Sequence, residues 1–382
     1  MSEDFMASMR RALAASRKSD PAEATRIIQA ALAGAPAPDA APAPDARRRP
    51  RLDPDAEVVE PAAPRRGLRQ RLRKPLREAL RTLREGRRAL WSQPDGEPAA
   101  APAVPEGARF ETRRFACAAG ARDYRLYVPS PGAGPVRGLV VMLHGCKQNP
   151  DDFATGTGMN ALAETHRLIV AYPGQTASDN MSACWNWFRP GDQRRDAGEP
   201  AILAGLALAL ADEFGIDRGR IFAAGLSAGG AMAAVLGESY PDVFAAIGVH
   251  SGLPAGAAND VLSAFAAMRG EVGLAVPRRT EGEGPRVIVF LGSADATVSP
   301  VNAGRIVDAR AGALAGSEES GAAGGRGYRR QVFAGPRGAA HVESWLIEGA
   351  GHAWSGGQAP GSYTDPRGPD ASAEMVRFFM EA

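Results

Sequence analysis

Residues 220–232 read RIFAAGLSAGGAM and place Ser227 at the centre of a G-x-S-x-G pattern. The apolar residues before the pattern predict a short buried strand over 220–224, and the residues after it predict a helix over 231–238. A serine flanked by glycines between a strand and a helix is typical of a nucleophile elbow. Glycine is needed there because Cβ atoms on the flanking residues would collide in so tight a turn. In a glycine-rich chain the same pattern also arises by chance around an ordinary loop serine, so the surrounding sequence must decide.

The region 107–382 alternates predicted strands with predicted helices. This alternation favours an α/β fold with a mostly parallel, twisted sheet and helices on both faces. A sheet of this kind carries its active site at the carboxyl ends of its strands. The expected elements are a β-hairpin over 109–116 and 123–128, strands at 137–143, 168–172, 245–249, 286–291, 329–333 and 342–347, and helices at 153–165, 201–214, 302–313 and 371–381.

A nucleophilic serine needs a base and an acid, which follow it in the order Asp or Glu and then His in this type of fold. Asp295 lies in FLGSADATVSP, four residues after the predicted strand 286–291, and we expect it to be the acid. His352 lies in EGAGHAWSGG, directly after the strand 342–347, and we expect it to be the base. The alternatives are an Asx-turn role for Asp295 and a surface-loop position for His352.

The developing negative charge on an attacked carbonyl oxygen needs two backbone N–H donors, which form an oxyanion hole. Ala228 directly follows Ser227, and its N–H is the first predicted donor. Cys146 follows the strand 137–143 in the sequence His144-Gly145-Cys146, and its N–H is the second predicted donor. We expect His144 to bond the loop backbone rather than to act as a second base. This chemistry requires no metal and no cofactor.

Six ordered stretches between residues 110 and 380 resemble the polyhydroxybutyrate depolymerase family of esterases. The resemblance implies an α/β-hydrolase fold and a relationship to feruloyl and acetylxylan esterases. Residue by residue it implies Ser227 as nucleophile, Asp295 as acid, His352 as base and Cys146 at the oxyanion hole. The stretches are LHGCKQNPDDFA (143–154), SACWNWF (182–188), RRDAGEP (194–200), GLSAGGAM (225–232), GSADATVSP (292–300) and GHAWSGG (351–357).

We therefore expect a serine esterase that hydrolyses short-chain polyhydroxyalkanoate or its oligomers. The alternatives are a feruloyl- or acetyl-ester hydrolase acting on sugar esters, and a granule- or membrane-associated protein with a non-catalytic hydrolase scaffold. Trp354 is two residues from His352 and is expected to line the cleft, and Gln148 is expected near its mouth. Trp185 and Trp187 alternate, so one should pack in the core while the other faces substrate.

The first 106 residues differ in composition from the rest. We expect a short helical segment over 1–33, a disordered Ala/Pro-rich linker over 34–64, a basic amphipathic helix over 65–91 and a second linker over 92–106. The segment 65–91 has eleven Arg or Lys residues and two Glu, a net charge of +9 in a chain of net charge +2. It could bind an anionic lipid or polyester granule surface, or dock on its own acidic catalytic domain; nucleic-acid binding is less favoured, because no nucleic-acid fold signature accompanies it.

The amino terminus lacks the apolar stretch of a signal peptide, and no run of 18 apolar residues occurs, so we expect a cytoplasmic protein. The three cysteines, Cys117, Cys146 and Cys184, are too few for a disulfide framework and too far apart for a zinc site. A bridge between Cys146 and Cys184 is one alternative, but reduced thiols are expected in a cytoplasm.

Overall fold

The computed structural model describes residues 102–132, 134–271, 284–335 and 340–381. The segments predicted over 1–33, 34–64 and 65–91 lie outside the described residues, as does 92–101 of the second linker.

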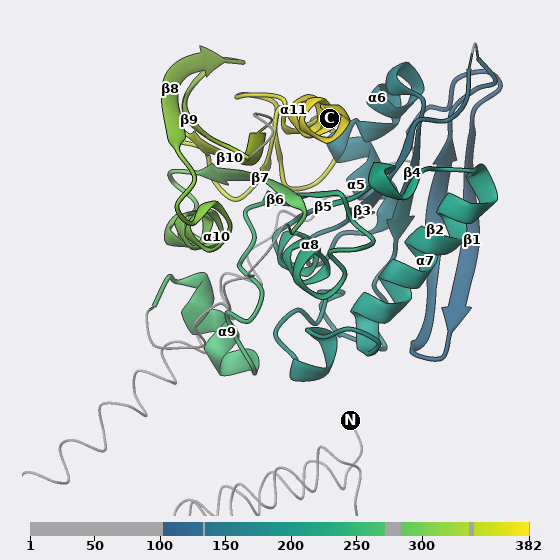
Figure 1. The fold of residues 1–382 in the computed structure, drawn as a ribbon, viewed down its shortest axis with the longest axis horizontal. Helices are drawn as coiled ribbons and strands as arrows, with labels where there is room; N and C mark the ends of the chain where they lie inside the picture. The colour runs from purple at the N-terminus through teal and green to yellow at the C-terminus, as the bar shows by residue number, and fades with distance from the viewer. Residues whose placement is uncertain (1–101, 133, 272–283, 336–339, 382) are drawn as a thin grey trace, which may run out of the picture. The chain divides into compact units, whose positions relative to one another are not determined.

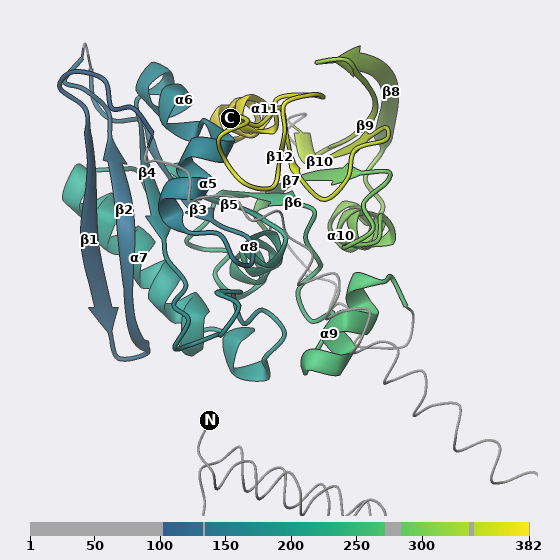
Figure 2. The same ribbon diagram turned by 180° about the vertical axis from the view of Figure 1, so that it is seen from behind.

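Ten strands within the described residues form one sheet in the order β1-β2-β4-β3-β5-β6-β7-β10-β9-β8. The six central strands from β4 to β10 are parallel to one another, and antiparallel strands flank them on both sides. The hairpin β1–β2 lies at one edge of the sheet and β8–β9 at the other (Figures 1 and 2). The strands are β1 (Arg109–Cys117), β2 (Gly120–Val128), β3 (Gly138–Leu143), β4 (Leu168–Pro173), β5 (Ile221–Leu226), β6 (Ala246–His250), β7 (Arg286–Gly292), β8 (Gly316–Ala323), β9 (Arg326–Ala334), β10 (Ala340–Ile347), and the separate pair β11 (Trp354–Ser355) and β12 (Thr364–Asp365).

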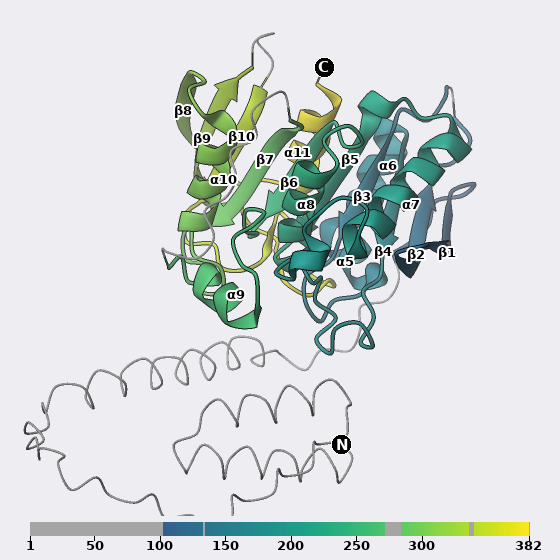
Figure 3. The same ribbon diagram turned by 60° about the horizontal axis from the view of Figure 1, so that its bottom comes forward.

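Helices cover both faces of the sheet, as the alternation of elements predicted. Helices α7, α8 and α10 lie on one face (Figure 3), and their apolar side chains pack in one core cluster with the strands. Helices α5, α6 and α11 pack in a second cluster on the other face. The helices are α5 (Pro150–Thr157), α6 (Met159–His166), α7 (Gly198–Phe214), α8 (Ala228–Ser239), α9 (Val261–Met268), α10 (Val301–Ala311) and α11 (Ala371–Met380), with the short 3-10 turns η1 (Pro190–Asp192) and η2 (Arg218–Arg220).

The central strands are apolar along their whole length because both of their faces are covered. Every residue of β3, β4 and β5 is buried, so side chains that point to opposite faces enter the two different clusters. Burial of so much apolar surface is the main force that holds the two helical layers on the sheet. It also fixes the carboxyl ends of the parallel strands along one edge.

The predicted elements of the region 107–382 are present, and the structure adds the short strand pair β11–β12, which was not predicted; three further differences follow. The helix predicted over 153–165 is two helices, because Gly158 has a φ of 62° and ends α5 before α6 begins. Strand β8 was missed because its sequence, GSEESGAA, has no alternation of apolar residues; it is held by backbone pairing to β9. Helix α9 lies in a region, 253–285, for which the sequence predicted no structure.

Candidate active site

Ser227 lies between the end of β5 and the start of α8, in a backbone conformation with φ 56° and ψ −117°. A non-glycine residue is rarely found with positive φ, and such strain is typical of functional turns. The Ser227 N–H donates to the carbonyl oxygen of His250, 2.8 Å away, at the end of the neighbouring strand β6. The turn therefore holds the Ser227 side chain at the carboxyl edge of the sheet.

The glycines on either side of Ser227 are required by close approach of the backbone. A Cβ atom placed on Gly229 would lie 2.0 Å from the carbonyl oxygen of Leu143, and one on Gly225 would lie 2.6 Å from the same atom. Leu143 is the last residue of β3, so the elbow and the neighbouring strand end are packed directly against each other. This contact explains the pattern of glycines that the sequence showed.

Asp295 and His352 are joined by a hydrogen bond of 2.8 Å between Oδ2 and Nδ1. Asp295 follows β7 and His352 follows β10, and these strands are parallel neighbours, so their carboxyl ends bring the two loops together. The other carboxylate oxygen, Oδ1, accepts hydrogen bonds of 2.9 Å from the backbone N–H groups of Thr297 and Val298. The Asp295 side chain is thus held by three donors.

Electrostatics favour the ionised form of Asp295. Burial by itself would raise the pKa of this carboxyl group, but the hydrogen bonds from His352 and from two backbone amides outweigh burial, and the pKa lies below its ordinary value. A carboxylate can only accept a hydrogen bond, so Nδ1 of His352 carries the proton of this bond. The Nε2 atom of a neutral ring in this tautomer is free to accept a proton.

Ser227 and His352 line the same cavity, which has a volume of about 550 Å³. Gly145, Cys146 and Ala228 line it on the side of the predicted oxyanion hole. Much of the remaining wall is apolar, which favours a substrate with little polar surface. The apolar side chains of this wall are Met181, Trp187, Phe188, Leu226, Leu253, Val261, Ala264, Phe265, Met268 and Val298.

The two predicted oxyanion donors have no partner elsewhere in the described part of the chain. Ala228 is the first residue of α8, where backbone N–H groups have no partner within the helix. The N–H of Cys146 makes no hydrogen bond within the described residues, whereas the N–H of Gly145 donates to Oε1 of Gln148 at 2.9 Å. Both donors belong to residues that line the cavity.

His144 is buried and holds the backbone of two loops, as expected from the sequence. Its Nε2 atom accepts the N–H of Gln175 at 3.0 Å, which requires the proton to be on Nδ1; that atom donates to the carbonyl oxygen of Gly145 at 2.7 Å. Burial lowers the pKa of His144 to about 4, so the ring is neutral near pH 7. His144 therefore supports the loop that ends at Cys146.

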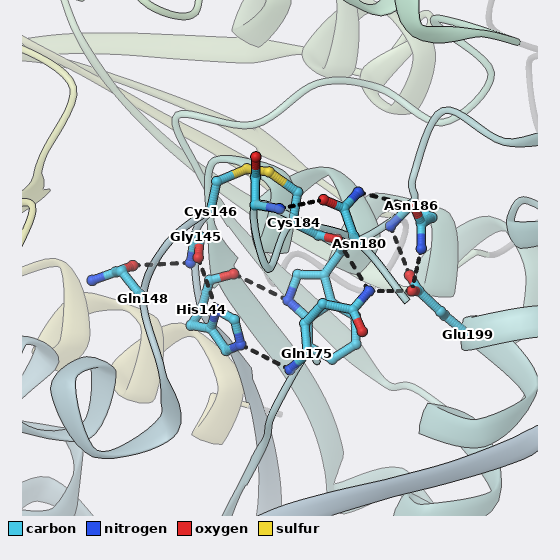
Figure 4. Close-up of a disulfide and its surroundings, with 11 residues drawn as sticks. His144, Gly145, Cys146, Gln148, Gln175, Asn180, Cys184, Asn186 and Glu199 are labelled. Atoms are coloured by element: carbon cyan, nitrogen blue, oxygen red, sulfur yellow. Dashed lines mark hydrogen bonds between the residues drawn. A yellow bond between two sulfur atoms is a disulfide. The ribbon is translucent and has the colours of Figure 1, made fainter. Parts of the chain in front are cut away.

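Cys146 and Cys184 form a disulfide (Figure 4), with their Cα atoms 4.2 Å apart. The prediction of two reduced thiols is wrong. The bridge links the loop after β3 to the loop between β4 and α7, which also meet through the Lys147 N–H and the Ser182 carbonyl oxygen, 2.8 Å apart. Thirty-eight residues separate the two cysteines, and no sequence pattern showed that their loops are neighbours. Cys117 is free and exposed.

A buried carboxylate, Glu199, organises the loop that contains Cys184 (Figure 4). It accepts hydrogen bonds from the backbone N–H of Asn186 at 2.7 Å and from its side-chain Nδ2 at 2.8 Å. The Gln175 side chain donates both to Glu199 and to the Cys184 carbonyl oxygen. Burial raises the pKa of Glu199. The stretch RRDAGEP contained this residue, but nothing in it showed that the carboxylate is buried.

The four predicted substrate-binding residues have different positions. Trp187 lines the cavity, whereas Trp185 is fully buried and donates from Nε1 to the His144 carbonyl oxygen at 3.0 Å, so the alternation predicted for this pair is observed. The predictions for Trp354 and Gln148 are wrong, because both side chains are buried and neither lines the cavity. Trp354 stacks on the ring of His250, with centroids 5.0 Å apart.

Several residues that form the cavity had no functional role predicted for them. Tyr363 lines it and packs edge-on against His352, with ring centroids 6.5 Å apart. Helix α9 contributes Val261, Ala264, Phe265 and Met268 to the wall. Apolar residues at 261, 264, 265 and 268, spaced as on one face of a helix, were the available signal for a buried helix face, but they do not identify which cavity it faces.

Metal-ligand clusters and membrane-spanning helices are both absent from the described residues. No group of three or more His, Cys, Asp or Glu side chains in these residues could hold a metal ion. No helix in this part of the chain is long and apolar enough to cross a membrane.

Residues 122–327 match the profile of the protein family described as esterase PHB depolymerase. The match includes Ser227 and Asp295 and ends before His352. A poly(3-hydroxyalkanoate) depolymerase C from Paucimonas lemoignei is 33% identical over 241 residues, which cover 59% of this chain and 57% of that protein. A feruloyl esterase B from Neurospora crassa is 33% identical over 117 residues, or 30% of this chain and 39% of that protein. The matched part of this chain thus spans 57% of the length of the first of these relatives and 39% of the length of the second.

A solved structure, an acetyl xylan esterase from Aspergillus awamori, superposes with a TM-score of 0.53 at 21% sequence identity. The superposition covers 68% of this chain and 94% of the acetyl xylan esterase. It shows a common fold, and the predicted α/β-hydrolase architecture is confirmed.

Proposed function

This chain belongs to the PHB depolymerase family of esterases, and on that premise we propose that it is a serine esterase that hydrolyses short-chain polyhydroxyalkanoates or their oligomers. One observation carries the proposal. The Asp295–His352 hydrogen bond of 2.8 Å lies beside a cavity that His352 shares with the strained Ser227. A carboxylate that fixes one ring nitrogen and leaves the other able to accept the proton of a serine in the same cavity is the arrangement that activates a hydroxyl nucleophile.

In the proposed reaction, Ser227 Oγ attacks the ester carbonyl carbon while His352 Nε2 takes the hydroxyl proton. The ring becomes positively charged, and the ionised Asp295 stabilises that charge and holds the ring orientation. The tetrahedral intermediate then collapses, the C–O bond of the ester breaks, and His352 returns the proton to the leaving alcohol. The product at this stage is an acyl-serine on Ser227.

Deacylation repeats the sequence with water as the nucleophile. His352 removes a proton from the water molecule, the hydroxide oxygen adds to the acyl carbon, and the Ser227 oxygen leaves and recovers the proton. In both steps the N–H groups of Cys146 and Ala228 would stabilise the oxyanion, and each such donor is worth about 3 kcal/mol in comparable sites. Every group in this scheme belongs to the chain itself or to the substrate.

The cavity wall supports an aliphatic polyester as substrate. Large apolar side chains, including Trp187, Phe265 and Met268, line the cavity that contains Ser227. A hydroxybutyrate unit has a methyl-bearing backbone between its ester groups and would bury apolar surface against this wall. A sugar ester would place several of its hydroxyl groups against these apolar side chains, where their hydration is lost. Hydrolysis of feruloyl or acetyl sugar esters remains the second candidate because relatives of both names match the chain.

A substrate panel with two variants tests the function. Wild-type protein should hydrolyse p-nitrophenyl butyrate and amorphous poly(3-hydroxybutyrate) faster than methyl ferulate. Ser227→Ala should abolish all three activities, whereas Ser239→Ala, at the last turn of the same helix, should keep them. Full activity in Ser227→Ala would remove the proposed nucleophile. Preferential hydrolysis of methyl ferulate would favour the second candidate, and no hydrolysis of any ester would favour a non-catalytic scaffold.

The segment 65–91 supports a further proposal, namely attachment to a polyester granule or an anionic surface. The proposal rests on the net charge of the segment, +9, and on its leucines, which recur every three or four residues at 68, 72, 76, 80 and 83. Charge-driven attachment should weaken as salt rises from about 0.05 to about 0.5 M. A cytoplasmic location stays a prediction. The Cys146–Cys184 disulfide stands against it, because most cytosols keep thiols reduced. Alkylation of the thiols in freshly lysed cells, followed by mass measurement, would show which state the chain has in its compartment.

A further inference from the structure

Large apolar side chains that are exposed to solvent gather at the mouth of the active-site cavity. Of the five such side chains in the described residues, Met181 is 96% exposed and Val261 and Leu262 are each 50% exposed. Met181 and Val261 line the cavity, and Leu262 is the next residue of α9. We call these three side chains the apolar rim. Isolated apolar residues on a surface are ordinary, but a group beside a catalytic cavity indicates a binding surface.

The first turn of α9 fixes the position of Val261 and Leu262. Asp260 caps the helix, accepting the Ser263 N–H at 2.7 Å, and the Ser263 hydroxyl accepts the Asp260 N–H at 3.0 Å. This reciprocal cap satisfies N–H groups that have no partner within the helix. The two exposed side chains therefore stand on a helix whose start is firmly set.

Met181 is held by a separate set of contacts on the opposite loop. The Asn180 side chain accepts the Ser182 N–H at 3.0 Å, and the Asn180 carbonyl oxygen accepts the Ala183 N–H at 2.8 Å. The disulfide at Cys184 then ties this turn to the loop after β3. A residue that is almost fully exposed on a well-anchored turn is available to a partner without a large ordering cost.

On the side of α9, apolar side chains lie both in the cavity and at the rim. The sequence of α9, VLSAFAAM, has no charged residue; Phe265 and Met268 line the cavity while Leu262 faces solvent. A substrate that extends beyond the cavity would therefore meet apolar side chains on leaving it. Two positive residues, Lys147 and Arg189, and one negative residue, Asp179, also line the cavity, so its positive charge is too small to make a strong site for anionic lipid headgroups.

We propose that the apolar rim seats the cavity on the surface of a water-insoluble aliphatic polyester. The proposal rests on the esterase function proposed above and names the physical form of its substrate. Three side chains are too few for stable self-association, since lasting protein interfaces bury about 1,200 Å² or more. They are enough to hold an enzyme against an apolar solid, where each side chain loses its contact with water.

Adsorption of the full chain to amorphous poly(3-hydroxybutyrate) granules tests the proposal. The assay measures the protein left in solution after sedimentation, at about 0.5 M salt so that attraction through charge is screened. The test variant is Met181→Ser with Val261→Ser and Leu262→Ser, and thermal melting checks that it folds. The matched control is Val104→Ser. Val104 is 43% exposed and precedes β1. The start of β1 pairs with the end of β2, which lies beside the start of β4, so Val104 is near the amino ends of the parallel strands, whereas the cavity is at their carboxyl ends.

The triple variant should bind granules with a partition coefficient at least about tenfold below that of wild type, and Val104→Ser should stay within about twofold. Equal adsorption of the triple variant and wild type would overturn the proposal. Two other results would also overturn it: an equal loss of binding to phosphatidylcholine vesicles, which would make the rim a lipid surface, and a dimer that the triple substitution converts to monomer. If wild type adsorbs through the rim but hydrolyses no p-nitrophenyl butyrate, the result contradicts the proposed esterase function and supports the proposed role of the apolar rim.

Discussion

Replacement of Gly229 by alanine tests the contact between the elbow and β3. The added Cβ atom would lie 2.0 Å from the Leu143 carbonyl oxygen, 2.6 Å from the Leu143 carbonyl carbon and 2.7 Å from the His144 carbonyl oxygen. Ordinary contacts of this kind begin at 3.4 Å, so the backbone must separate by about 1.4 Å. All three neighbours are main-chain atoms, and none can rotate out of the way.

Overpacking of a well-packed core commonly costs about 1–3 kcal/mol, and a clash with main chain belongs at the upper end. For a domain of this size, about 3 kcal/mol corresponds to a fall in Tm of about 6–12 °C. The same shift would move the strand end that leads into Cys146, so we expect kcat to fall by about 100-fold, as displacements of about 1 Å do in active sites.

Gly304→Ala is the matched control for Gly229→Ala. Gly304 lies on the exposed side of α10, and a Cβ atom there meets no atom within 4 Å. Alanine should stabilise this helix by about 0.5–1 kcal/mol. Melting followed by circular dichroism and kinetics with p-nitrophenyl butyrate give both readouts. A Gly229→Ala protein that melts within about 1 °C of wild type and keeps its kcat would refute the reasoning.

Three further predictions concern the site and its supports. Asp295→Asn should lower kcat for p-nitrophenyl butyrate by about 10⁴-fold, by analogy with the same change in serine proteases, and a loss below tenfold would contradict its proposed role. Cys184→Ser should lower kcat by about tenfold, because it releases the loop of the predicted oxyanion donor. The lost disulfide, which closes a 38-residue loop, should also lower the free energy of unfolding by about 3–4 kcal/mol. Cys117→Ser should change neither quantity, and equal kcat in the two variants would contradict the role of the disulfide in holding this loop. Burial lowers the pKa of His144 to about 4 and that of His250 to about 3. Between pH 6.5 and pH 4, these histidines are therefore protonated in the unfolded chain but stay neutral in the folded protein. The free energy of unfolding should therefore decrease as the pH is lowered through this window, by about 2 kcal/mol per histidine at pH 5. Urea unfolding curves that coincide at pH 7 and pH 5 would contradict this prediction.

The parts of the site that could be predicted from sequence are those that directly follow a strand. Ser227, Asp295 and His352 each come within a few residues of an apolar run, and the carboxyl ends of parallel strands meet at one edge. Strand order need not be known for this inference, because every strand of the parallel set contributes to the same edge. The proximity of Asp295 and His352 could therefore be predicted from the sequence.

The wrong predictions about the site concern the direction in which side chains point and the contacts between separate loops. Trp354 is close to His352 in the sequence, but the chain bends at His352 and Ala353, and the Trp354 side chain enters the core and stacks on His250. Gln148 follows the oxyanion loop, yet its side chain turns back beneath that loop to accept the Gly145 N–H. The contact between Cys146 and Cys184 depends on how the short loop after β3 and the long segment between β4 and α7 fold over each other. No local pattern encodes such contacts.

The central claim, that Ser227 is the nucleophile activated by His352, is tested most directly by covalent labelling. The protein is incubated with a p-nitrophenyl alkylphosphonate, which a nucleophilic serine attacks with release of p-nitrophenol, and the adduct is located by peptide mass spectrometry. We predict one adduct per chain, on Ser227, formed in parallel with loss of esterase activity and at least about 100-fold more slowly in His352→Ala. An adduct on another residue, or labelling of His352→Ala at the wild-type rate, would contradict the claim.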